Sequence, residues 1–552
     1  MKRSRVANDK ESISSHARSL MLAKGLAEIS TASPDLSSKE AGILSGVAAT
    51  VSRNIAASLL RVVSVSLVAL VLPSYLAHHL PVETYAAWIL ILQLGAYVLY
   101  LDLGIQTGIS KFVAEYHAKG DDAAAGHHAS AGLALMMLAG ILGVGLTLGL
   151  AWQVPRLFST MPANLYHDVR ISVVLIGLSL SFGLVCSAYS AVFLGLQRYW
   201  IPMSIVVVNR ACFAASVLAV VALHGKIATM GLAVAIVNVF TGSLQVVAWR
   251  KKASHVFIST RSVDYRVLKK MARYCSLQSI WTVGMLCVTG LDIAIVGHYD
   301  YAETAYYSIA TLPTTFVLLI ISSMVNPLMP ASSAMSTQRS AVEMGEFLVK
   351  ITRYATLLLL LTGLPLMVCG YPILRVWVGS EYAVHTYKYL RILVLANATR
   401  SLCAPYAAMI AATGSQGAAT VAAVSEAVVN VSSSLYLASR YGAIGVAFGT
   451  VLGSLVSVSL HFLITMRFTR EKMTISRLRL FRTGVLRPAT VAIPSIVLLP
   501  LWWPRAQTLN TQLTIAWAIG TLICAWFGGL SQNDRKDLVR FARSVYVSAP
   551  ST

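Results

Sequence analysis

Long apolar segments, each near 20 residues, constrain this chain more than any other feature. A helix needs about 20 apolar residues to cross the hydrocarbon core of a bilayer. Fourteen such segments lie at roughly 55–76, 85–105, 129–151, 169–194, 203–223, 229–249, 277–297, 303–331, 352–374, 387–412, 418–439, 443–466, 488–503 and 512–530. Only 12% of the residues are charged, whereas soluble domains contain about 25%. The sequence therefore excludes a soluble enzyme and predicts an all-α polytopic membrane protein with about 14 transmembrane helices.

Lysine and arginine are distributed unevenly over the connections between these segments. With the N-terminus inside, the inside connections contain 32 basic residues and the outside connections contain five. Cytoplasmic loops of membrane proteins carry such an excess, and the pattern requires an even number of spans. We therefore expect both termini in the cytoplasm. The outside connections are too short to form the catalytic domain of a membrane enzyme.

The basic residues and cysteines do not indicate a cofactor. The net charge is +22, but the basic residues occupy short connections and form no nucleic-acid-binding domain. None of the seven cysteines forms a CxxC pair, and all lie in or beside apolar segments, which favours a role as small apolar fillers. A nucleotide-binding motif is also missing from the sequence. The sequence predicts no cofactor, no metal and no nucleic-acid partner.

Three pairs of similar stretches indicate an internal repeat. ETYA at Glu83 matches ETAY at Glu303, YSAVFLGLQRYWIP at Tyr189 matches YAAMIAATGSQGAA at Tyr406, and MGLAVAIVNVF at Met230 matches IGVAFGTVLGS at Ile444. The offsets are 220, 217 and 214 residues, which is six helices. Because six is even, both copies insert with the same orientation around an axis along the membrane normal. The repeat predicts two six-helix lobes around a central cavity, an architecture typical of alternating-access transporters.

The repeat and the charged connections predict five segments. They are a cytoplasmic N-terminal tail over 1–54, an N-lobe over 55–249, a basic cytoplasmic linker over 250–276, a C-lobe over 277–466, and a region over 467–552 with a basic loop, two extra helices and a cytoplasmic tail. The thirteenth span, 488–503, is short and flanked by proline.

Three stretches resemble a known family. LDLGIQTGISKFVAEYHAKGDD at 101–122, LDIAIVGHY at 291–299 and YGAIGVAFGTVLGS at 441–454 resemble polysaccharide transporters, which include the O-antigen and exopolysaccharide flippases. This family belongs to the multidrug/oligosaccharidyl-lipid/polysaccharide exporter superfamily, and the resemblance covers roughly residues 50–470. It implies a flippase for polyprenyl-pyrophosphate-linked oligosaccharides in surface or exopolysaccharide biosynthesis. The partners that it implies are the lipid-linked oligosaccharide, membrane lipids, a polysaccharide polymerase and a chain-length regulator.

Basic residues inside the expected spans point to an anionic cargo. A basic side chain at mid-bilayer costs about 2.5–3.5 kcal/mol, so it is retained where it faces a cavity, a partner or the interface. A guanidinium forms bidentate hydrogen bonds with phosphate and stays charged when buried. We expect four arginines to bind pyrophosphate or acidic sugars: Arg61, Arg210, Arg391 and Arg400. The resemblance implies that spans one, two, seven and eight line the cavity, which favours Arg61. The alternative for these residues is an ion pair within the membrane.

Three carboxylates lie within apolar spans and have different expected roles. Asp292 is a candidate for the cavity wall, where it would either exchange a proton that couples flipping to a gradient or neutralise Arg61 across the lobes. Asp102 and Glu426 are coupling or structural acids. For Asp102 we favour capping or pairing near the first loop, and for Glu426 an ion pair with Arg400. Six polar residues suit sugar contacts: Gln93, Tyr97, Tyr100, Gln278, Trp281 and Asn326.

Two other transporters of the same superfamily are alternatives. One is a flippase for the lipid-linked peptidoglycan precursor, which shares fourteen spans and a cationic cavity. The other is a multidrug exporter, which uses membrane-embedded acids to bind cationic drugs. The first span contains Arg61 and no acid, which argues against cationic drugs. Arg61 does not separate the two kinds of flippase, and the resemblance to polysaccharide transporters favours the flippase of lipid-linked oligosaccharides.

Overall fold

The computed structural model describes residues 38–259, 261, 263–414, 416–502, 511–536 and 539. The chain divides into two compact units, Met1–Leu59 and Leu60–Thr552, each described by itself. In the first unit the described residues are helical and belong to the start of α2 (Ser38–His79). Most of the expected N-terminal tail over 1–54 lies outside the described residues. All further contacts are those of the second unit.

The described part of the chain is built from helices, without strands. Inside a bilayer the backbone has no water to bond with, so a single spanning segment satisfies its amides and carbonyls by forming a helix. Among the described residues, twelve helices are long and apolar enough to cross a membrane, and the expected all-α polytopic fold is confirmed. Two of the expected spans are not among the twelve. The span 387–412 falls mostly on the 22-residue helix Ser380–Ser401, which is less apolar because it contains Lys388, Arg391 and Arg400, and the span 488–503 is divided into short helical pieces.

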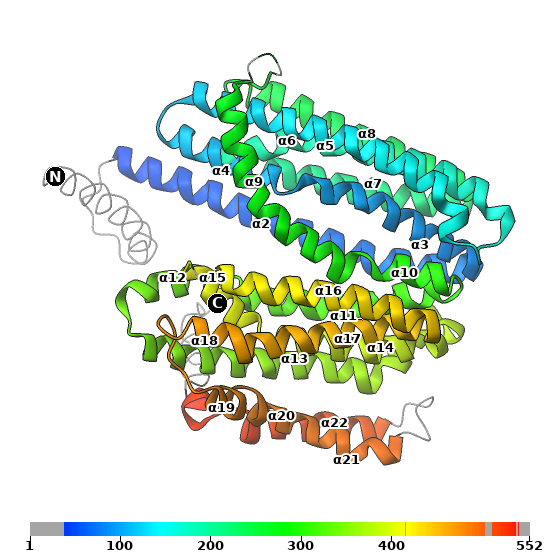
Figure 1. The fold of residues 1–552 in the computed structure, drawn as a ribbon, viewed down its shortest axis with the longest axis vertical. Coiled ribbons are helices and arrows are strands. Elements are labelled where there is room, and N and C mark those ends of the chain that lie inside the picture. Colours follow the sequence, from blue (N-terminus) through cyan, green and yellow to red (C-terminus); the bar gives the residue numbers. More distant parts are fainter. Residues whose placement is uncertain are drawn as a thin grey trace, which may run out of the picture. The chain divides into compact units, whose positions relative to one another are not determined.

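The first group of helices is the N-terminal bundle, shown in blue to green in Figure 1. Its elements are α2, α3 (Val82–Ala96), η2 (Tyr97–Asp102), α4 (Ile105–Ala118), α5 (Asp122–Leu157), η3 (Ala163–Leu165), α6 (Tyr166–Gly195), α7 (Trp200–Ala222) and α8 (Ile227–Lys252). α6 lies centrally, because it packs against α3, α4, α5 and α8. Small buried residues on α6, such as Gly177 and Ser181, allow these neighbours to approach closely.

The second group is the C-terminal bundle, shown in green to orange in Figure 1. Its elements are α10 (Asp292–Tyr299), α11 (Glu303–Val325), α12 (Leu328–Gln338), α13 (Ala341–Val378), α14 (Ser380–Ser401), α15 (Ala404–Ala412), α16 (Gln416–Tyr441), α17 (Ala443–Leu460), η6 (His461–Thr465) and α18 (Met466–Phe468). α16 and α17 form its most extensive pair. Gly449 faces Ser434, and Gly453 faces Asn430, with too little space for a Cβ atom.

A third group, the C-terminal hairpin, packs on α13. Its elements are α19 (Arg477–Arg479), η7 (Leu480–Leu486), α20 (Arg487–Ala489), η8 (Thr490–Ala492), α21 (Ile493–Trp502), α22 (Thr511–Ile523) and η10 (Cys524–Gly529). η7 and α20 contact α13, and α21 packs against α22. A small hydrophobic core around Leu357, Val491 and Trp517 joins the hairpin to α13.

The helices of the second and seventh expected spans are both interrupted, and the two interruptions meet. In the second span, η2 ends at Leu103 and Gly104, whose φ angles are 46° and 79°. In the seventh, α9 (Tyr265–Met285) passes through the π-helical segment η5 (Leu286–Gly290) into α10. Gln93 Nε2 and Tyr97 Oη donate to the Gly290 carbonyl at 2.6 and 3.0 Å. Two of the residues expected to touch sugar therefore satisfy backbone groups at this break.

The seventh span packs against both bundles on each side of its break. α9 packs against α4 and α5 of the N-terminal bundle and also against α16, and Met271 and Cys275 belong to the core of the N-terminal bundle. Beyond the break, η5 contacts α16, and α10 contacts α3 as well as α11, α16 and α17. The expected start of the C-lobe at residue 277 thus falls within α9, which contacts the other bundle.

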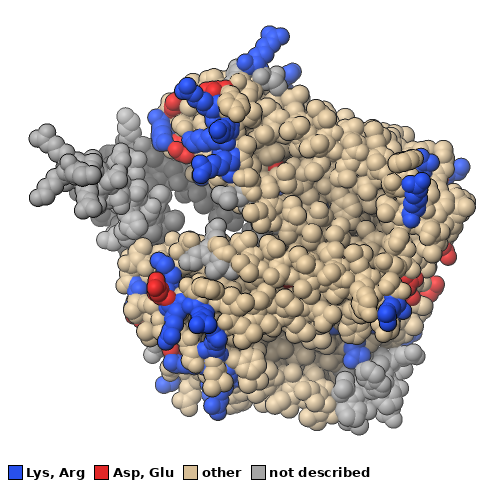
Figure 2. Space-filling view, viewed as in Figure 1, with Lys and Arg blue, Asp and Glu red and all other residues tan. Residues whose placement is uncertain are grey.

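Basic residues gather at one end of the helices. In the face shown in Figure 2, lysine and arginine lie mainly around the start of α9 and around α19, and few lie at the opposite end. We call the end of the helices that holds most of these lysines and arginines the basic end. At the opposite end the two bundles meet: Tyr301 Oη donates to the Glu83 carbonyl at 2.6 Å, and Trp377 Nε1 donates to the Leu70 carbonyl at 2.7 Å.

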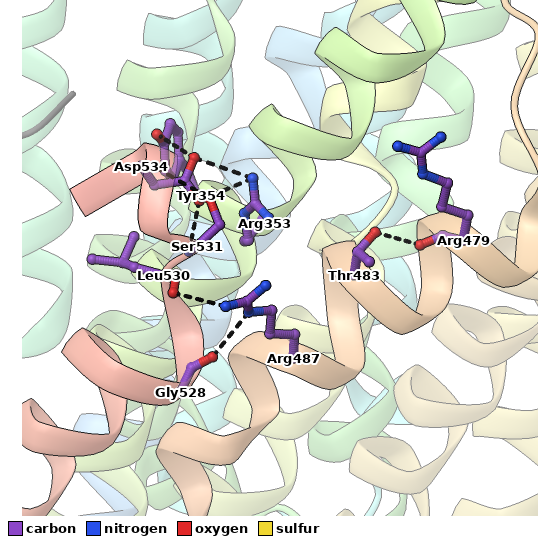
Figure 3. A network of polar contacts seen from close by, with 9 residues as sticks. All are labelled: Arg353, Tyr354, Arg479, Thr483, Arg487, Gly528, Leu530, Ser531 and Asp534. Atoms are coloured by element: carbon purple, nitrogen blue, oxygen red, sulfur yellow. Dashed lines mark hydrogen bonds and ion pairs between the residues drawn. The ribbon is translucent and has the colours of Figure 1, made fainter. Parts of the chain in front are cut away.

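A buried ion pair attaches the C-terminal hairpin to α13 at the basic end (Figure 3). Arg353 Nη2 lies 2.9 Å from Asp534 Oδ2, and both side chains are largely buried. Tyr354 Oη and the amide and hydroxyl of Ser531 also donate to this carboxylate. Arg487 donates to the carbonyls of Gly528 and Leu530 at the end of η10. This polar clamp fixes the hairpin.

Burial raises the pKa of Asp534, but the hydrogen bonds from Ser531 and Tyr354 and the charge of Arg353 outweigh it. The pKa therefore lies below its ordinary value. Because folding lowers this pKa, the stabilisation is fully present above the unfolded value of about 3.9. It is lost as pH falls through the folded value.

We predict that Asp534→Ala destabilises the protein by about 3–5 kcal/mol, because it leaves the Arg353 guanidinium buried and unpaired. Thermal unfolding of the purified protein in detergent measures the loss. The double variant Arg353→Met with Asp534→Ala is the control, and it should lose less because no charge is orphaned. Equal unfolding temperatures for wild type and Asp534→Ala would contradict this role.

Candidate functional site

Arg61 lies on α2 without a neutralising partner in the described part of the chain. Its side chain is partly exposed, and its Nε atom is buried without a hydrogen-bond partner. Among the described residues no ion pair involves Arg61. The expected alternative, neutralisation by Asp292, is not seen, because the contacts of Asp292 come from other residues. Arg61 therefore has unused hydrogen-bonding capacity for an anion.

Arg210 is a second arginine of the N-terminal bundle, on α7. Its side chain is exposed, and no ion pair to it occurs within the described ranges. A charged group on the lipid face of a spanning helix is costly, so such residues face a bundle interior or a water-filled cavity. The position therefore suits an anion-binding wall.

A polar network lies beside Arg210 and was not expected from the sequence. Asn209 on α7 donates to Thr241 Oγ1 at 3.0 Å, and Asn238 on α8 donates to Ser179 Oγ on α6 at 3.1 Å. Such contacts join three apolar helices through neutral groups. A sequence signal existed in the Asn209-Arg210 pair, since adjacent polar residues are rare in an apolar span.

Asp292 lies at the centre of a polar cluster in the C-terminal bundle. It is the first residue of α10 and is 7% exposed. Its Oδ2 atom accepts hydrogen bonds from Thr450 Oγ1 on α17 at 3.2 Å and from Tyr307 Oη on α11 at 3.5 Å. Its Oδ1 atom is buried and has no partner in the described structure. One carboxylate oxygen is thus left for a proton or a cation.

Arg400 lies between the two buried acids of this bundle. Arg400 Nε is 2.5 Å from Glu426 Oε1, and the guanidinium also interacts electrostatically with Asp292. Arg400 Nη1 donates to Asn397 Oδ1 at 3.4 Å, whereas Nη2 is buried and unpaired in the described structure. The expected pair of Glu426 with Arg400 is therefore present. This ion pair occupies the Arg400 guanidinium, which was expected from the sequence to bind the substrate.

Asn430 is a residue of this cluster that the sequence analysis missed. It is fully buried on α16, and both its Oδ1 and Nδ2 atoms lack partners in the described structure. It faces Gly453 of α17, one turn from Thr450, so it lies close to the level of Asp292. The glycines of α17 at i, i+4 spacing, Gly445, Gly449 and Gly453, were the signal. They bring the two helices into contact around an asparagine.

The remaining predicted residues have structural contacts. Asp102 accepts a hydrogen bond from the backbone amide of Gln106 at 3.1 Å, which caps α4 after the break in the second span. The Arg391 guanidinium lies 5.4 Å from the centre of the Tyr387 ring. The side chain of Trp281 lies outside the described part.

The charged residues of the two bundles suit different ligands. The N-terminal bundle presents two arginines whose charges are not neutralised by described residues, which suits an anion. The C-terminal bundle encloses two acids, one arginine and neutral oxygen donors from threonine, tyrosine and asparagine. Oxygen ligands of this kind suit a proton or a hard cation. No described group of three or more His, Cys, Asp or Glu residues forms a multivalent metal site.

Known structures share this fold. The inward-closed form of the lipid II flippase MurJ is 14% identical, covers 85% of this chain and 98% of its own, and has a TM-score of 0.67. An inward-facing MATE-family multidrug resistance transporter of the MOP superfamily is 16% identical, covers 76% of this chain and 99% of its own, and has a TM-score of 0.64. A MOP transporter from Pyrococcus furiosus is 16% identical, covers 77% of this chain and 96% of its own, and has a TM-score of 0.53.

The chain therefore has the fold of the polytopic transporters of the MOP superfamily. At these identities the likeness shows the fold and leaves the cargo open. No protein-family model matches the sequence, and no curated protein matches it. The neighbours are transporters and flippases rather than enzymes.

We predict that Arg400→Met destabilises the protein by about 3–5 kcal/mol, because it leaves Asp292 and Glu426 without a counter-charge. Glu426→Gln should cost roughly 1–3 kcal/mol, since Asp292 still balances Arg400. Thermal unfolding of both variants in detergent checks this order. A larger loss for Glu426→Gln would show that Asp292 does not interact with Arg400.

Proposed function

We propose that the protein is a flippase that moves a polyprenyl-pyrophosphate-linked oligosaccharide across the cell membrane by alternating access. The observation that carries the proposal is the pair Arg61 and Arg210. They are cations on spanning helices of one bundle, and no described carboxylate neutralises them. A pyrophosphate carries two or more negative charges, and a guanidinium group binds phosphate oxygens through paired N–H donors while it stays charged.

The arrangement of the bundles supports alternating access. They are joined at the opposite end by Tyr301 with Glu83 and by Trp377 with Leu70. The cargo head group would then enter from the basic end, which we assign to the cytoplasm from the positive-inside bias. Separation of these contacts would release it on the other side. Both termini would be cytoplasmic, and the membrane would be the inner membrane of a bacterium.

Asp292 supplies a means of coupling in this proposal. Its free Oδ1 atom and the unpaired Asn430 lie where α10 packs on α16 and α17. A proton or a monovalent cation bound there would change the charge of the cluster at the junction of these helices. Because α10 continues from α9, which contacts the other bundle, this charge change would reach both bundles.

The alternatives differ in the cargo. A peptidoglycan-precursor flippase has a pyrophosphate-linked cargo as well, and the MurJ structure shares the fold, so the same arginines would serve. A multidrug exporter of the MATE type would bind cations, which Arg61 and Arg210 would repel. The Pyrococcus furiosus transporter is described as having a binding pocket of reverse polarity, suggesting a different function. Pocket polarity thus varies within one fold, and in this protein Arg61 and Arg210 favour an anion. The implied polymerase and chain-length regulator would receive the flipped product.

We predict that Arg61→Ala abolishes surface polysaccharide in a deletion strain without lowering the amount of protein in the membrane. A charged hydrogen bond is worth about 1.5–3 kcal/mol, which is roughly 10- to 150-fold in cargo affinity. Arg61→Lys should fall between, because it keeps the charge and loses the fork geometry. Arg156→Ala, which changes an arginine in the last turn of α5 in the same bundle, is the matched control. Normal polysaccharide from Arg61→Ala would exclude Arg61 from the cargo site.

We predict that Asp292→Asn uncouples transport from its driving ion, because an amide of the same shape neither titrates nor neutralises a cation. Cargo binding, measured by native mass spectrometry, should remain within about threefold of wild type, since the arginines of the N-terminal bundle are intact. Cargo movement in vesicles should lose its dependence on proton and sodium gradients. Unchanged gradient dependence would remove Asp292 from coupling.

A further inference from the structure

We propose that a groove between α9 and α16 holds the polyprenyl chain of the cargo, with the phosphate end of the lipid at the start of α9. The inference rests on the proposed function, because it assumes a polyprenyl-pyrophosphate cargo. The groove has a volume of about 710 Å³ and lies where the seventh span packs against the C-terminal bundle. The described residues that line it are uncharged and include Ile280, Val283, Gly284, Val424, Val428 and Leu435.

The groove is apolar and open at its surface. The exposed fractions of Ile280, Val283 and Val428 are 48%, 50% and 62%. A Cβ atom added at Gly284 would meet nothing within 4 Å. Both walls belong to segments that are long and apolar enough to cross a membrane. An apolar groove at this depth favours a hydrocarbon chain as its occupant, because an empty groove would lose the dispersion contacts of its walls.

A basic stripe leads to the groove along one face of α9. The stripe consists of Arg266, Lys269 and Arg273, which are exposed and lie three and four residues apart. This spacing places them on one face of the helix, and Ile280 continues that face seven residues after Arg273. None of the three basic side chains forms a hydrogen bond or ion pair with a described residue. The nearest acid in the sequence, Asp264, caps α9 by accepting a hydrogen bond from the Arg266 amide at 2.8 Å.

The basic stripe and the groove together match a lipid with an anionic head. Figure 2 shows lysine and arginine around the start of α9, followed by uncharged surface along α9 and α16. A phosphate at the stripe would form charge-assisted hydrogen bonds with lysine and arginine. Its chain would then enter the groove, since Arg273 and Ile280 are about 10 Å apart along the helix axis. A soluble anion would use the stripe and leave the groove empty.

The depth of the groove favours a polyprenyl chain over the acyl chain of a phospholipid. α16 has 26 residues and is therefore about 39 Å long. The lining residues Val424 to Leu435 occupy its middle, from about 12 to about 29 Å beyond its first residue. One leaflet supplies about 15 Å of hydrocarbon, so an acyl chain anchored at the basic end would reach only the near part of the groove. A longer isoprenoid chain would cross the midplane and occupy all of it.

The test is photolabelling of the full-length protein in phosphatidylcholine vesicles by a polyprenyl pyrophosphate that carries a diazirine in its chain. Mass spectrometry of the digested protein locates the labels, which should fall on residues 280–287 and 424–435. Excess unlabelled polyprenyl pyrophosphate should remove them, and the same excess of phosphatidylglycerol should not. Labels that both lipids remove equally would overturn the proposal in favour of a general lipid groove.

Gly284→Leu tests the groove itself. The leucine has room in the empty groove and favours the helix more than glycine does, so the variant should fold. It would compete with the chain for the same space, and we expect labelling at least about fivefold weaker, because overpacking typically costs this much or more. The matched control is Gly145→Leu, at an exposed glycine of α5 where an added Cβ atom also meets nothing within 4 Å. Equal losses in the two variants would overturn the proposal.

The double variant Lys269→Gln with Arg273→Gln tests the basic stripe. Labelling by the pyrophosphate probe should fall about 30-fold, or about fivefold for each charge removed. Labelling by the uncharged polyprenol with the same chain and diazirine should stay unchanged, which would show that the variant is folded. Unchanged labelling by the pyrophosphate probe would overturn the assignment of the phosphate to this stripe.

Movement of the same lipid between leaflets by the wild type tests the proposed function separately. Movement of the lipid without labels in the groove would overturn this inference and leave the proposed function standing. Labels in the groove without movement of the lipid would confirm the binding site and contradict the proposed function.

Discussion

The need to satisfy backbone polar groups without water governs this structure. Each apolar segment meets the need by forming a helix, and where a helix breaks another group must replace the lost bond. The Gly290 carbonyl, at the break in the seventh span, is held by Gln93 and Tyr97 of the second span. The backbone amide of Gln106, after the break in the second span, is capped by Asp102. The two interrupted helices thus depend on polar side chains that an unbroken helix would not need.

The absence of water also makes an unpaired buried charge costly. Arg400, Glu426 and Asp292 are close together in the C-terminal bundle, where burial of any one alone would be costly. Arg61 and Arg210 in the N-terminal bundle have no such partners among the described residues. In one bundle an arginine therefore lies with two carboxylates, and in the other two arginines have no such partners among the described residues. Between them, α9 and α10 form one interrupted span that contacts both bundles.

Periodicity and charge counting predicted much of the fold, because long apolar segments and basic connections are local signals. The all-helical architecture and the additional C-terminal helices followed from the apolar segments. The ion pair of Arg400 with Glu426 was predicted because each is a charged residue within an apolar span. The positions of the helix breaks could not be predicted, because η5, like α10, is composed mainly of apolar residues. Asn430 and Arg353 were also missed. Their importance comes from Gly453 and Asp534, residues brought to them by packing, and no sequence window contains both partners.

The central claim is that this transporter fold moves an anionic, pyrophosphate-linked lipid. The most direct measurement uses the purified protein in vesicles that contain a fluorescent polyprenyl-pyrophosphate-linked oligosaccharide, with its leaflet distribution followed by a membrane-impermeant quencher. The account predicts that the protein speeds exchange of this lipid between leaflets and leaves a cationic dye untransported. Transport of the cationic dye, with the lipid confined to its original leaflet, would contradict it.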